Sequence, residues 1–349
     1  MAHDPASLKQ ALCAQALGLG FALCRVASAG LAEHRQSYRD WLAEGFHGDM
    51  AWMQRNAERR EDPRVVQPGA QSVVVLAFNY YPSPEEFHPQ YRIARYAWNQ
   101  DYHDILEPKL KALEQWLSAH GGEQRRYVDT GPVLERSWAS QAGLGWGGKS
   151  TVQIHPKLGT WFFLSEILTT LDLPPDEPAR DHCGKCRRCM DACPTGAIVA
   201  ERRLDARRCL SYLSIEYRGS IPLEFRRAMG NRIYGCDDCL TACPWNRFAQ
   251  QTQEASLLAR ESVTGMALRD FLSLDDQAFR RLFAGSPIKR IKRPAFLRNV
   301  CVALGNCGGP EDLPALQLAA MDPDPLIAEH AQWALQQIQP HAPHRLPEA

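Results

Sequence analysis

Residues 183–194 read CGKCRRCMDACP, and residues 236–244 read CDDCLTACP. The first run has the spacing C-x2-C-x2-C-x3-C-P, in which three cysteines ligate one [4Fe-4S] cluster and the fourth conventionally ligates a second. The second run lacks only its first cysteine, and Cys209, further upstream, supplies that thiol. The crossed pattern predicts two ligand sets: Cys183, Cys186, Cys189 and Cys243 for one cluster, and Cys193, Cys209, Cys236 and Cys239 for the other.

The alternative interpretation of these cysteines is a pair of zinc sites, because CxxC pairs also suit tetrahedral zinc. Zinc ribbons do not need the x2-x2-x3-Pro run, so the spacing favours iron–sulfur clusters. Close spacing in a chain without secretory features also indicates metal binding and not disulfides. The other four cysteines stand alone in apolar surroundings and are expected in the core: Cys13, Cys24, Cys301 and Cys307.

Length and composition predict a soluble protein of two or three domains. The chain has 349 residues, and its 40 Lys and Arg balance 40 Asp and Glu, which excludes a globally basic nucleic-acid binder. The N-terminus has no apolar signal region, and no stretch approaches the ~20 apolar residues that span a bilayer. We therefore expect a cytoplasmic location.

Three consecutive segments are expected along the chain. Residues 1–172 alternate short apolar runs with amphipathic stretches, which indicates an α/β domain with a parallel or mixed sheet covered by helices. The Pro-rich stretch 171–182 suits a linker into a ferredoxin-like domain at 173–254. Residues 255–349 are helical in character, and we expect them to contact RNA.

A weak repeat in the last segment predicts stacked helix pairs of the HEAT type. Residues 298–304 align with residues 329–335. Two sets of apolar residues follow helical spacing: Leu297, Val300, Cys301 and Leu304, then Ile327, Ala331, Ala334 and Ile338. Stretches rich in glycine, proline and aspartate separate the two helices, as in helical repeats.

The stretch GLGWGGKS at 143–150 formally satisfies the phosphate-loop pattern G-x4-G-K-[ST]. A phosphate loop follows a hydrophobic strand and begins a helix. Here the preceding residues are helical in character and the following ones, TVQIHP, are strand-like, so nucleotide binding is disfavoured. The glycines still permit the backbone to approach a large ligand closely.

Two polar residues of the first segment are candidates for chemistry. Asp129 follows a strand-like run in YVDTGP, where a carboxylate is either a catalytic acid or a turn-capping residue. The stretch DYHDIL at 101–106 comes near the pattern DxHxxG, by which some proteins ligate cobalt. Leu106 replaces the glycine, so His103 is either a ligand or an ordinary surface or core histidine.

The stretch from Arg280 to Arg298 contains seven basic residues and no acidic one. The basic residues are Arg280, Arg281, Lys289, Arg290, Lys292, Arg293 and Arg298. Such a stretch is either a solvated helix face or a site for nucleic-acid phosphates. Electron-transfer clusters give no reason for it, whereas an RNA substrate does.

Several motifs together resemble the epoxyqueuosine reductases over nearly the whole chain. They are RYAWNQDYH (95–103), DTGPVLER (129–136), AGLGWGGKST (142–151), GCDDC (235–239), CPWN (243–246) and KRPAFLRNV (292–300). The resemblance implies that residues 1–172 form a nitroreductase-like α/β domain that binds base-off cobalamin. It also makes Asp129 the proton donor.

The resemblance implies particular contacts. Those expected to bind the cofactor are Tyr96, Asp101, Tyr102, His103, Asp129, Gly145, Lys149, Ser150, Thr151, Gln153, Ser211 and Asp237. Those expected to bind tRNA are Lys289, Arg290, Lys292, Arg293 and Arg298.

The resemblance implies that the protein reduces epoxyqueuosine to queuosine at the wobble position of tRNA. The reductant would be cob(I)alamin, to which two [4Fe-4S] clusters supply electrons. A monomer supplied by an external one-electron donor, such as a flavodoxin or ferredoxin system, is expected. The alternatives are a ferredoxin-like electron carrier or a corrinoid-dependent reductase of a small molecule. A carrier has no use for the basic C-terminal stretch, and reductive dehalogenases usually carry an export signal, which is not expected in this N-terminus.

Overall fold

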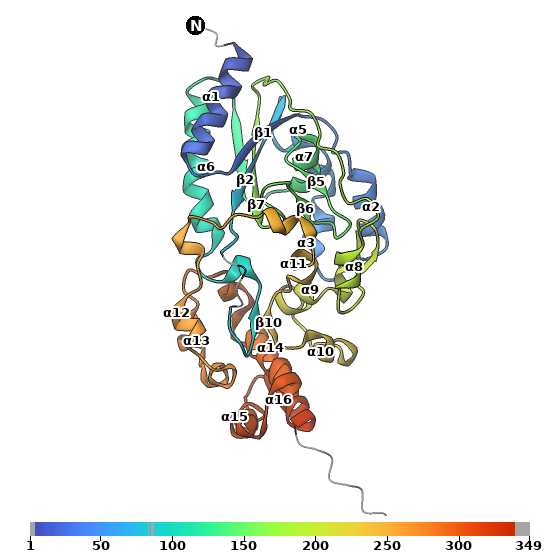
Figure 1. Cartoon of the computed structure of the whole chain (residues 1–349), viewed down its shortest axis with the longest axis vertical. Helices are drawn as coiled ribbons and strands as arrows, with labels where there is room; N and C mark the ends of the chain where they lie inside the picture. Colours follow the sequence, from blue (N-terminus) through green and yellow to red (C-terminus); the bar gives the residue numbers. More distant parts are fainter. Residues whose placement is uncertain (1–3, 83, 85–86, 339–349) are drawn as a thin grey trace, which may run out of the picture. The chain divides into compact units, whose positions relative to one another are not determined.

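The computed structural model describes residues 4–82, 84 and 87–338, which group into two compact units (Figure 1). The first unit takes the described residues of Met1–Pro82, Asp101–Arg207 and Asp238–Ala255. The second takes those of Ser83–Gln100, Arg208–Asp237 and Ser256–Ala349. The ferredoxin-like stretch is thus divided between the two units, which differs from the three consecutive segments expected.

A four-stranded sheet forms the centre of the first unit. Its order is β1 (Leu23–Ser28), β2 (Ser72–Asn79), β7 (Phe162–Thr169) and β4 (Gln124–Tyr127). All three pairings are antiparallel, so the expectation of a parallel or mixed sheet was wrong. The apolar run of β2 suggested a parallel strand, but a central antiparallel strand covered on both faces needs the same composition.

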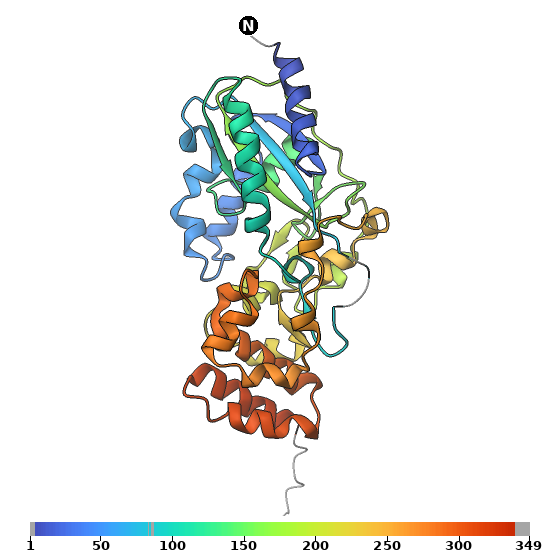
Figure 2. The ribbon, with the colours of Figure 1, turned by 90° about the vertical axis from the view of Figure 1, so that its left-hand side faces the viewer.

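Helices cover both faces of this sheet (Figures 1 and 2). On one face α1 (Pro5–Gly18) packs on β1 and on α6 (Tyr102–Ser118), which packs on β4 and β7. On the other face α7 (Glu135–Gln141) packs on β1, β2 and β7. Short helices fill the segment between β1 and β2: α2 (Arg35–Ala43), α3 (Ala51–Arg55), α4 (Ala57–Glu61) and α5 (Pro63–Val66).

Aspartates fix the starts of the two long helices. Asp4 accepts a hydrogen bond from the backbone N–H of Ser7 at 3.1 Å, with Pro5 as the first residue of α1. Asp101 likewise accepts from the backbone N–H of His103 at 3.1 Å at the start of α6. Both follow the preference for Asp at a helix N-cap, and the second fixes the backbone of a predicted site residue.

Short helices carry part of the cysteine runs of the first unit, which also contains two short hairpins. Helices α8 (Arg188–Asp191) and α11 (Asp238–Thr241) pack on each other, and a 3-10 helix, η3 (Pro244–Phe248), follows. Strand β5 (Trp146–Gly147) pairs with β6 (Gln153–Ile154), and β8 (Ile198–Ala200) pairs with β9 (Arg203–Leu204).

The second unit is built around α14 (Lys292–Cys307), of which eleven residues are buried. It packs on α16 (Pro325–Ile338), on α10 (Leu223–Met229), on α9 (Leu210–Ile215) and on α13 (Asp276–Leu282). Helix α15 (Leu313–Ala319) packs on α16, α12 (Glu261–Thr264) precedes α13, and β3 (Arg92–Ile93) pairs in parallel with β10 (Arg232–Tyr234).

The helical periodicity correctly identified the core of this unit. Seven of the eight predicted apolar residues are at most 1% exposed, and Ile338 packs against the same cluster. The HEAT-type arrangement of these helices stays a prediction. Among the lone cysteines Cys24 and Cys301 are buried as expected, whereas Cys13 is only half-buried and Cys307 is exposed, which corrects the expectation for Cys307.

Candidate active site and cluster ligands

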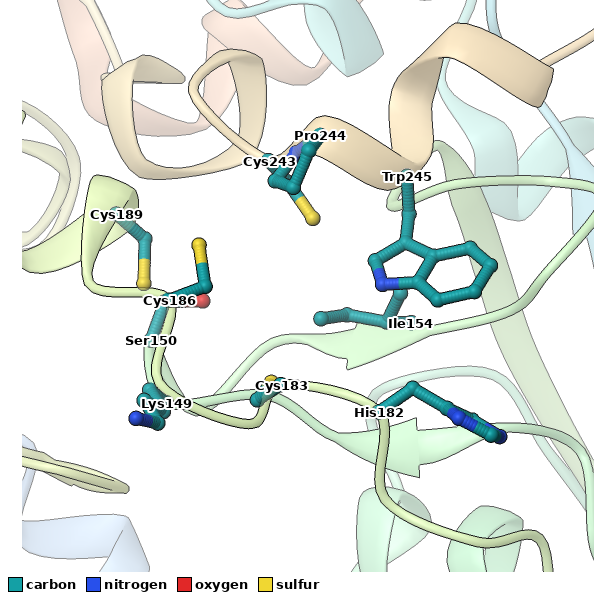
Figure 3. Close-up of a pocket in the computed structure, with 10 residues that line it drawn as sticks. All are labelled: Lys149, Ser150, Ile154, His182, Cys183, Cys186, Cys189, Cys243, Pro244 and Trp245. Atoms are coloured by element: carbon teal, nitrogen blue, oxygen red, sulfur yellow. The ribbon is translucent and has the colours of Figure 1, made fainter.

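Four cysteines from two distant runs line one cavity of the first unit (Figure 3). Cys183 and Cys186 come from the loop that leads into α8, Cys189 lies in α8, and Cys243 immediately precedes η3. Their side chains converge on the same space, which Trp245 and His182 border. This is the set that the crossed pattern assigned to one cluster, and it brings together thiols that lie far apart in the sequence.

The polypeptide around these thiols stabilises bound, deprotonated sulfur. The indole N–H of Trp146 donates to Sγ of Cys183 at 3.4 Å, and the backbone N–H of Ala197 donates to Sγ of Cys193 at 3.2 Å. Burial first, and then the neighbouring thiols, raise the pKa of Cys243 to about 11 in the metal-free protein. Binding of a metal cluster must therefore displace a proton from this thiol.

The other four predicted ligands are divided between the units. Cys193 and Cys239 belong to the first unit, and Cys209 and Cys236 belong to the second. All four are half-buried. Among the described residues, no three His, Cys, Asp or Glu side chains are arranged to hold a single metal ion. The second ligand set stays a prediction.

Asp129 lies in a strained turn after β4. Its φ is +57°, and the N–H of Thr130 donates to the carbonyl of Val128 across it at 2.5 Å, which is a γ-turn. A non-glycine residue in this conformation costs about 1–3 kcal/mol and is typical of functional sites. Asp129 itself is exposed, so its carboxyl is open to a substrate.

Two side chains hold this turn in place. The phenol of Tyr102 donates to Oδ2 of Asp129 at 2.5 Å, and the ring of Tyr102 stacks on Phe163 with centroids 4.3 Å apart. The backbone N–H of Asp129 donates to Oε1 of Glu135 at 2.8 Å. The capping interpretation of Asp129 predicts that its carboxylate accepts backbone N–H groups, but the bond that the structure shows comes from a phenol.

His103 has the orientation of a histidine ligand, with one nitrogen fixed by a carboxylate. Its Nδ1 lies 2.7 Å from Oδ1 of Asp101, and its ring lies 4.2 Å from that of Tyr102. Its Nε2 is buried and has no hydrogen-bond partner among the described residues. A carboxylate partner of this kind is usual behind metal-bound histidines, so the geometry leaves the ligand interpretation open.

The glycine-rich loop at 143–150 is not a phosphate loop, as its order of elements indicated. Helix α7 precedes it, β5 lies within it, and the partner strand β6 follows it, so that no helix begins at its end. Gly145 has a φ of +101°, and a Cβ there would meet the carbonyl oxygen of Ile154 at 2.0 Å, so the hairpin itself requires this glycine. A Cβ at Gly147 would meet open space, which leaves room for close approach of a ligand.

The polar residues after these glycines are buried. Lys149 pairs with Glu201 at 2.6 Å, and Ser150 and Gln153 are 6% and 4% exposed. The Nε2 atom of Gln153 has no hydrogen-bond partner among the described residues. Thr151 has a φ of +67°, and its carbonyl accepts from Arg136 at 3.2 Å.

The remaining predicted cofactor contacts belong to the second unit. The hydroxyl of Tyr96 lies 3.3 Å from that of Tyr234, and Asp237 accepts from the backbone N–H of Arg95 at 2.7 Å. Ser211 is half-buried on α9. Their role toward a cofactor stays a prediction.

The basic stretch divides into exposed and internal residues. Arg298 is 0% exposed, and its guanidinium donates to the carbonyls of Leu213, Tyr217 and Gly219. The prediction that Arg298 contacts tRNA is therefore wrong, because a helix residue that faces the core cannot reach a phosphate.

Arg293 is also used inside the unit, since it donates to the carbonyl of Leu274 and pairs with Asp322. Its side chain is 15% exposed, which does not support the predicted contact. Lys289, Arg290 and Lys292 are exposed, as are Arg280 and Arg281.

Sequence reasoning missed two buried side chains, Glu166 and Trp146, that lie close to predicted site residues. Glu166 is a completely buried acid in β7, and the only signal for it was a single charge within the apolar run FFLSEILTT. Trp146 was grouped with the glycine-rich loop, although its indole faces a cysteine ligand. No sequence spacing connects residues 146 and 183.

Four cysteine side chains around one cavity, and an exposed acid held in a strained turn of the same unit, are the features of an iron–sulfur oxidoreductase. The family model described as "4Fe-4S double cluster binding domain" matches residues 182–246, which include all eight predicted ligands. The model "Epoxyqueuosine reductase QueG, DUF1730" matches residues 60–130. None of the described helices is long and apolar enough to cross a membrane.

Whole-chain comparisons give the particular family. The epoxyqueuosine reductase of Vibrio cholerae is 43% identical over 92% of this chain and 89% of its own length. That of Escherichia coli is 40% identical over 92% of this chain and 87% of its own. The chain belongs to the epoxyqueuosine reductase family.

Solved structures agree with this assignment. A crystal structure of an epoxyqueuosine reductase with an epoxyqueuosine-modified tRNA stem loop has a TM-score of 0.88 at 30% identity, covering 96% of this chain and 91% of that chain. The Bacillus subtilis enzyme, with its catalytic aspartate loop swung out of the active site, has a TM-score of 0.86 at 30% identity over the same shares.

Proposed function

We propose that this protein reduces epoxyqueuosine at the wobble position of tRNA to queuosine. The observation that carries this function is identity of 40% or more to epoxyqueuosine reductases over nine-tenths of the chain. It is supported by the solved relative that holds a modified tRNA stem loop. Neither an electron carrier nor a reductase of a small molecule has such support.

The reaction needs both electrons and protons. Converting an epoxide to an alkene breaks both C–O bonds, forms one C=C π bond and releases the oxygen as water, which consumes two electrons and two protons. The protein must therefore accept electrons from an external donor, such as a flavodoxin or ferredoxin system, and must deliver protons to the departing oxygen.

The cysteines fit iron–sulfur clusters. Four thiols surround one cavity, and N–H groups donate to the sulfurs of Cys183 and Cys193, as is usual where thiolates bind iron. We assign the first cluster to Cys183, Cys186, Cys189 and Cys243, and the second to Cys193, Cys209, Cys236 and Cys239. These residues would hold the groups that pass electrons one at a time.

Part of the predicted cofactor site fits a large polar ligand such as base-off cobalamin. The buried Nε2 atoms of His103 and Gln153 have no hydrogen-bond partner among the described residues, and the space beyond Gly147 is open. Bound cobalamin would supply the strongly nucleophilic reductant that an epoxide requires. The residues that would hold it are Tyr96, Asp101, Tyr102, His103, Gly145, Lys149, Ser150, Thr151, Gln153, Ser211 and Asp237.

Asp129 would donate a proton to the oxygen as it leaves carbon. Its carboxyl is exposed, and Tyr102 and Glu135 fix the orientation of the turn that carries it. A positioned acid contributes about 10²–10⁴-fold to the rate of such a step. The phenol of Tyr102 would stabilise the carboxylate that remains.

The tRNA would bind partly through exposed cations of the second unit. Lys289, Arg290 and Lys292 are exposed residues around the start of α14, where they can meet phosphates. An enzyme of this kind would act in the cytoplasm as a monomer.

The test is anaerobic reconstitution with iron, sulfide and cobalamin, followed by incubation with an epoxyqueuosine-modified stem loop and a chemical reductant. Mass spectrometry of the digested RNA is expected to show queuosine. Complete absence of conversion by a protein with full iron and cobalamin content would contradict the function.

A further inference from the structure

Two carboxyl side chains, Glu135 and Glu166, lie together next to the Asp129 turn. Glu166 is in the middle of β7, opposite Tyr127 of β4, and is 0% exposed. Because side chains alternate along a strand, Glu166 shares the face of Leu164 and Leu168. That face packs against the apolar side of α7, of which Glu135 is the first residue.

This environment cannot hold two negative charges. Neither carboxyl oxygen of Glu166 has a donor among the described residues, and the group that faces it is the carboxyl of Glu135. Burial and mutual repulsion raise the pKa of Glu166 well above its ordinary value. Burial, and then repulsion by Asp129, raise the pKa of Glu135 to about 7. A proton between the two carboxyls satisfies both groups.

Glu135 also connects this pair to the proposed acid. Its Oε1 accepts the backbone N–H of Asp129 at 2.8 Å, the residue whose φ of +57° is strained. A Glu135 carboxylate that accepts one proton from Glu166 and one N–H from Asp129 would hold the turn from inside the unit.

Few other charges surround the pair. Arg136, the residue after Glu135, favours the ionised form of Glu135. The guanidinium of Arg136 donates to the carbonyl of Thr151. From α4, Arg60 donates to the carbonyl of Gly131 at 3.2 Å. Tyr127 of β4 lies opposite Glu166 in register, and Tyr102 of α6 donates to Asp129. The two cations of β4 have other partners: Arg125 donates to the carbonyl of Val66, and Arg126 pairs with Glu107 and Glu114 of α6.

We propose that Glu135 and Glu166 share one proton and act as a positioning pair that keeps Asp129 in its strained turn. This inference rests on the proposed function of Asp129 as proton donor. Glu135 would be the positioning residue for Asp129, and Glu166 would keep Glu135 in place.

Infrared spectroscopy tests the shared proton without any turnover. The reconstituted protein at pH 8 is expected to show the carbonyl band of a protonated carboxylic acid, and Glu166→Gln is expected to remove it. Asp312→Asn, which changes a buried acid of the second unit that is 8% exposed, is the matched control and is expected to keep the band. Identical spectra for the wild-type protein and Glu166→Gln would overturn the shared proton.

Hydrogen exchange tests the positioning role. Glu135→Ala is expected to speed amide exchange in the peptide that contains Asp129, because the acceptor of its N–H is lost. Glu135→Gln retains an oxygen acceptor of the same size and is expected to keep exchange slow. Unchanged exchange in Glu135→Ala would overturn the role, and Glu135→Gln keeps the test valid if the alanine variant does not fold.

Kinetics then link the pair to the reaction. Glu135→Ala is expected to lower kcat for the modified stem loop about a hundredfold with KM unchanged, because the acid is misplaced but the RNA site is not. Glu135→Gln is expected to recover part of that loss. Equal kcat in wild type and Glu135→Ala would contradict the proposal, whereas a wild-type protein without turnover would contradict only the proposed function, since spectra and exchange still report on the pair.

Discussion

The indole N–H of Trp146 donates a hydrogen bond to Sγ of Cys183 over 3.4 Å, from the hairpin β5–β6 to the first cysteine of the cluster motif. Hydrogen bonds to cluster sulfurs stabilise the more negative, reduced state and so raise the reduction potential. Trp146 is 3% exposed and makes an edge contact with Trp245 at 5.1 Å, so its orientation is fixed.

Trp146→Phe is therefore expected to make the reduction potential of the cluster at Cys183 more negative while iron content stays the same. A redox titration followed by electron paramagnetic resonance measures this. Trp116→Phe, which changes a tryptophan of α6 whose ring makes a tilted contact with that of His120, is the control. An unchanged potential in Trp146→Phe would show that this hydrogen bond does not tune the cluster.

Iron content tests the crossed ligand sets. The reconstituted wild-type protein is expected to hold about eight irons per chain, because two [4Fe-4S] clusters need eight thiolates. Cys243→Ala is expected to remove the signal of the cluster at Cys183, whereas Cys193→Ala is expected to damage the cluster at Cys236 and Cys239. Cys307→Ala changes an exposed lone thiol and should keep all the iron. Stoichiometric zinc without iron would contradict both sets.

Asp129→Asn is expected to lower turnover about 10²–10⁴-fold, because it removes a proton donor with little change of shape. Iron content, cobalamin binding and stem-loop affinity should stay as in the wild type. Tyr102→Phe removes only the phenol that donates to Asp129 and should cost less. Full activity of Asp129→Asn would show that Asp129 is not the proton donor and would favour the interpretation of this residue as a turn cap.

The sequence predicted the cluster motif and the helical core well, because cysteine spacing and helix periodicity are local properties. The direction of strand pairing was wrong because the apolar run of β2 fits any central strand covered on both faces. Arg298 was misassigned because a run of cations does not say which of them face inward. Glu166 was missed because its partner, Glu135, is brought to it only by packing of α7 on the sheet.

The exposed cations around the start of α14 are expected to bind RNA. Replacing Lys289, Arg290 and Lys292 together with Ala should weaken tRNA binding and reduce the log–log salt slope by about three at most. Lys111→Ala, which removes an exposed positive charge from α6, is the control for a change of charge elsewhere in the protein. If the triple variant bound tRNA with the affinity and salt slope of the wild type, the RNA contact would have to lie elsewhere, in the arginine-bearing stretch between residues 202 and 232.

Arg298 is expected to stabilise the second unit. Arg298→Met leaves several backbone carbonyls without their donor, which should lower the free energy of unfolding by about 3 kcal/mol or more. Thermal denaturation should show a lower midpoint than in Arg280→Met, which changes an exposed arginine. If Arg298→Met instead kept its stability and lost tRNA affinity, the internal role would be contradicted.

The acid pair predicts a pH dependence of stability. Because the pKa of Glu135 is raised to about 7 in the folded protein and that of Glu166 is raised well above its ordinary value, the folded protein binds protons that the unfolded chain releases. Their contribution to stability is complete below the ordinary pKa of glutamate and is lost as pH rises through 7 and above. The thermal midpoint of the wild type should fall over this range more steeply than that of Glu166→Gln, and parallel curves would contradict the raised pKa values.

Conversion of the nucleoside itself tests the account most directly. A tRNA stem loop that carries epoxyqueuosine is incubated with the reconstituted protein and reductant. The RNA is then digested to nucleosides, which are separated and identified by mass spectrometry. The proposed function predicts loss of one oxygen atom from the modified base, giving queuosine, in the wild type and about 10²–10⁴-fold more slowly in Asp129→Asn. Unaltered epoxyqueuosine after incubation with wild-type protein that carries its full iron and cobalamin would contradict it.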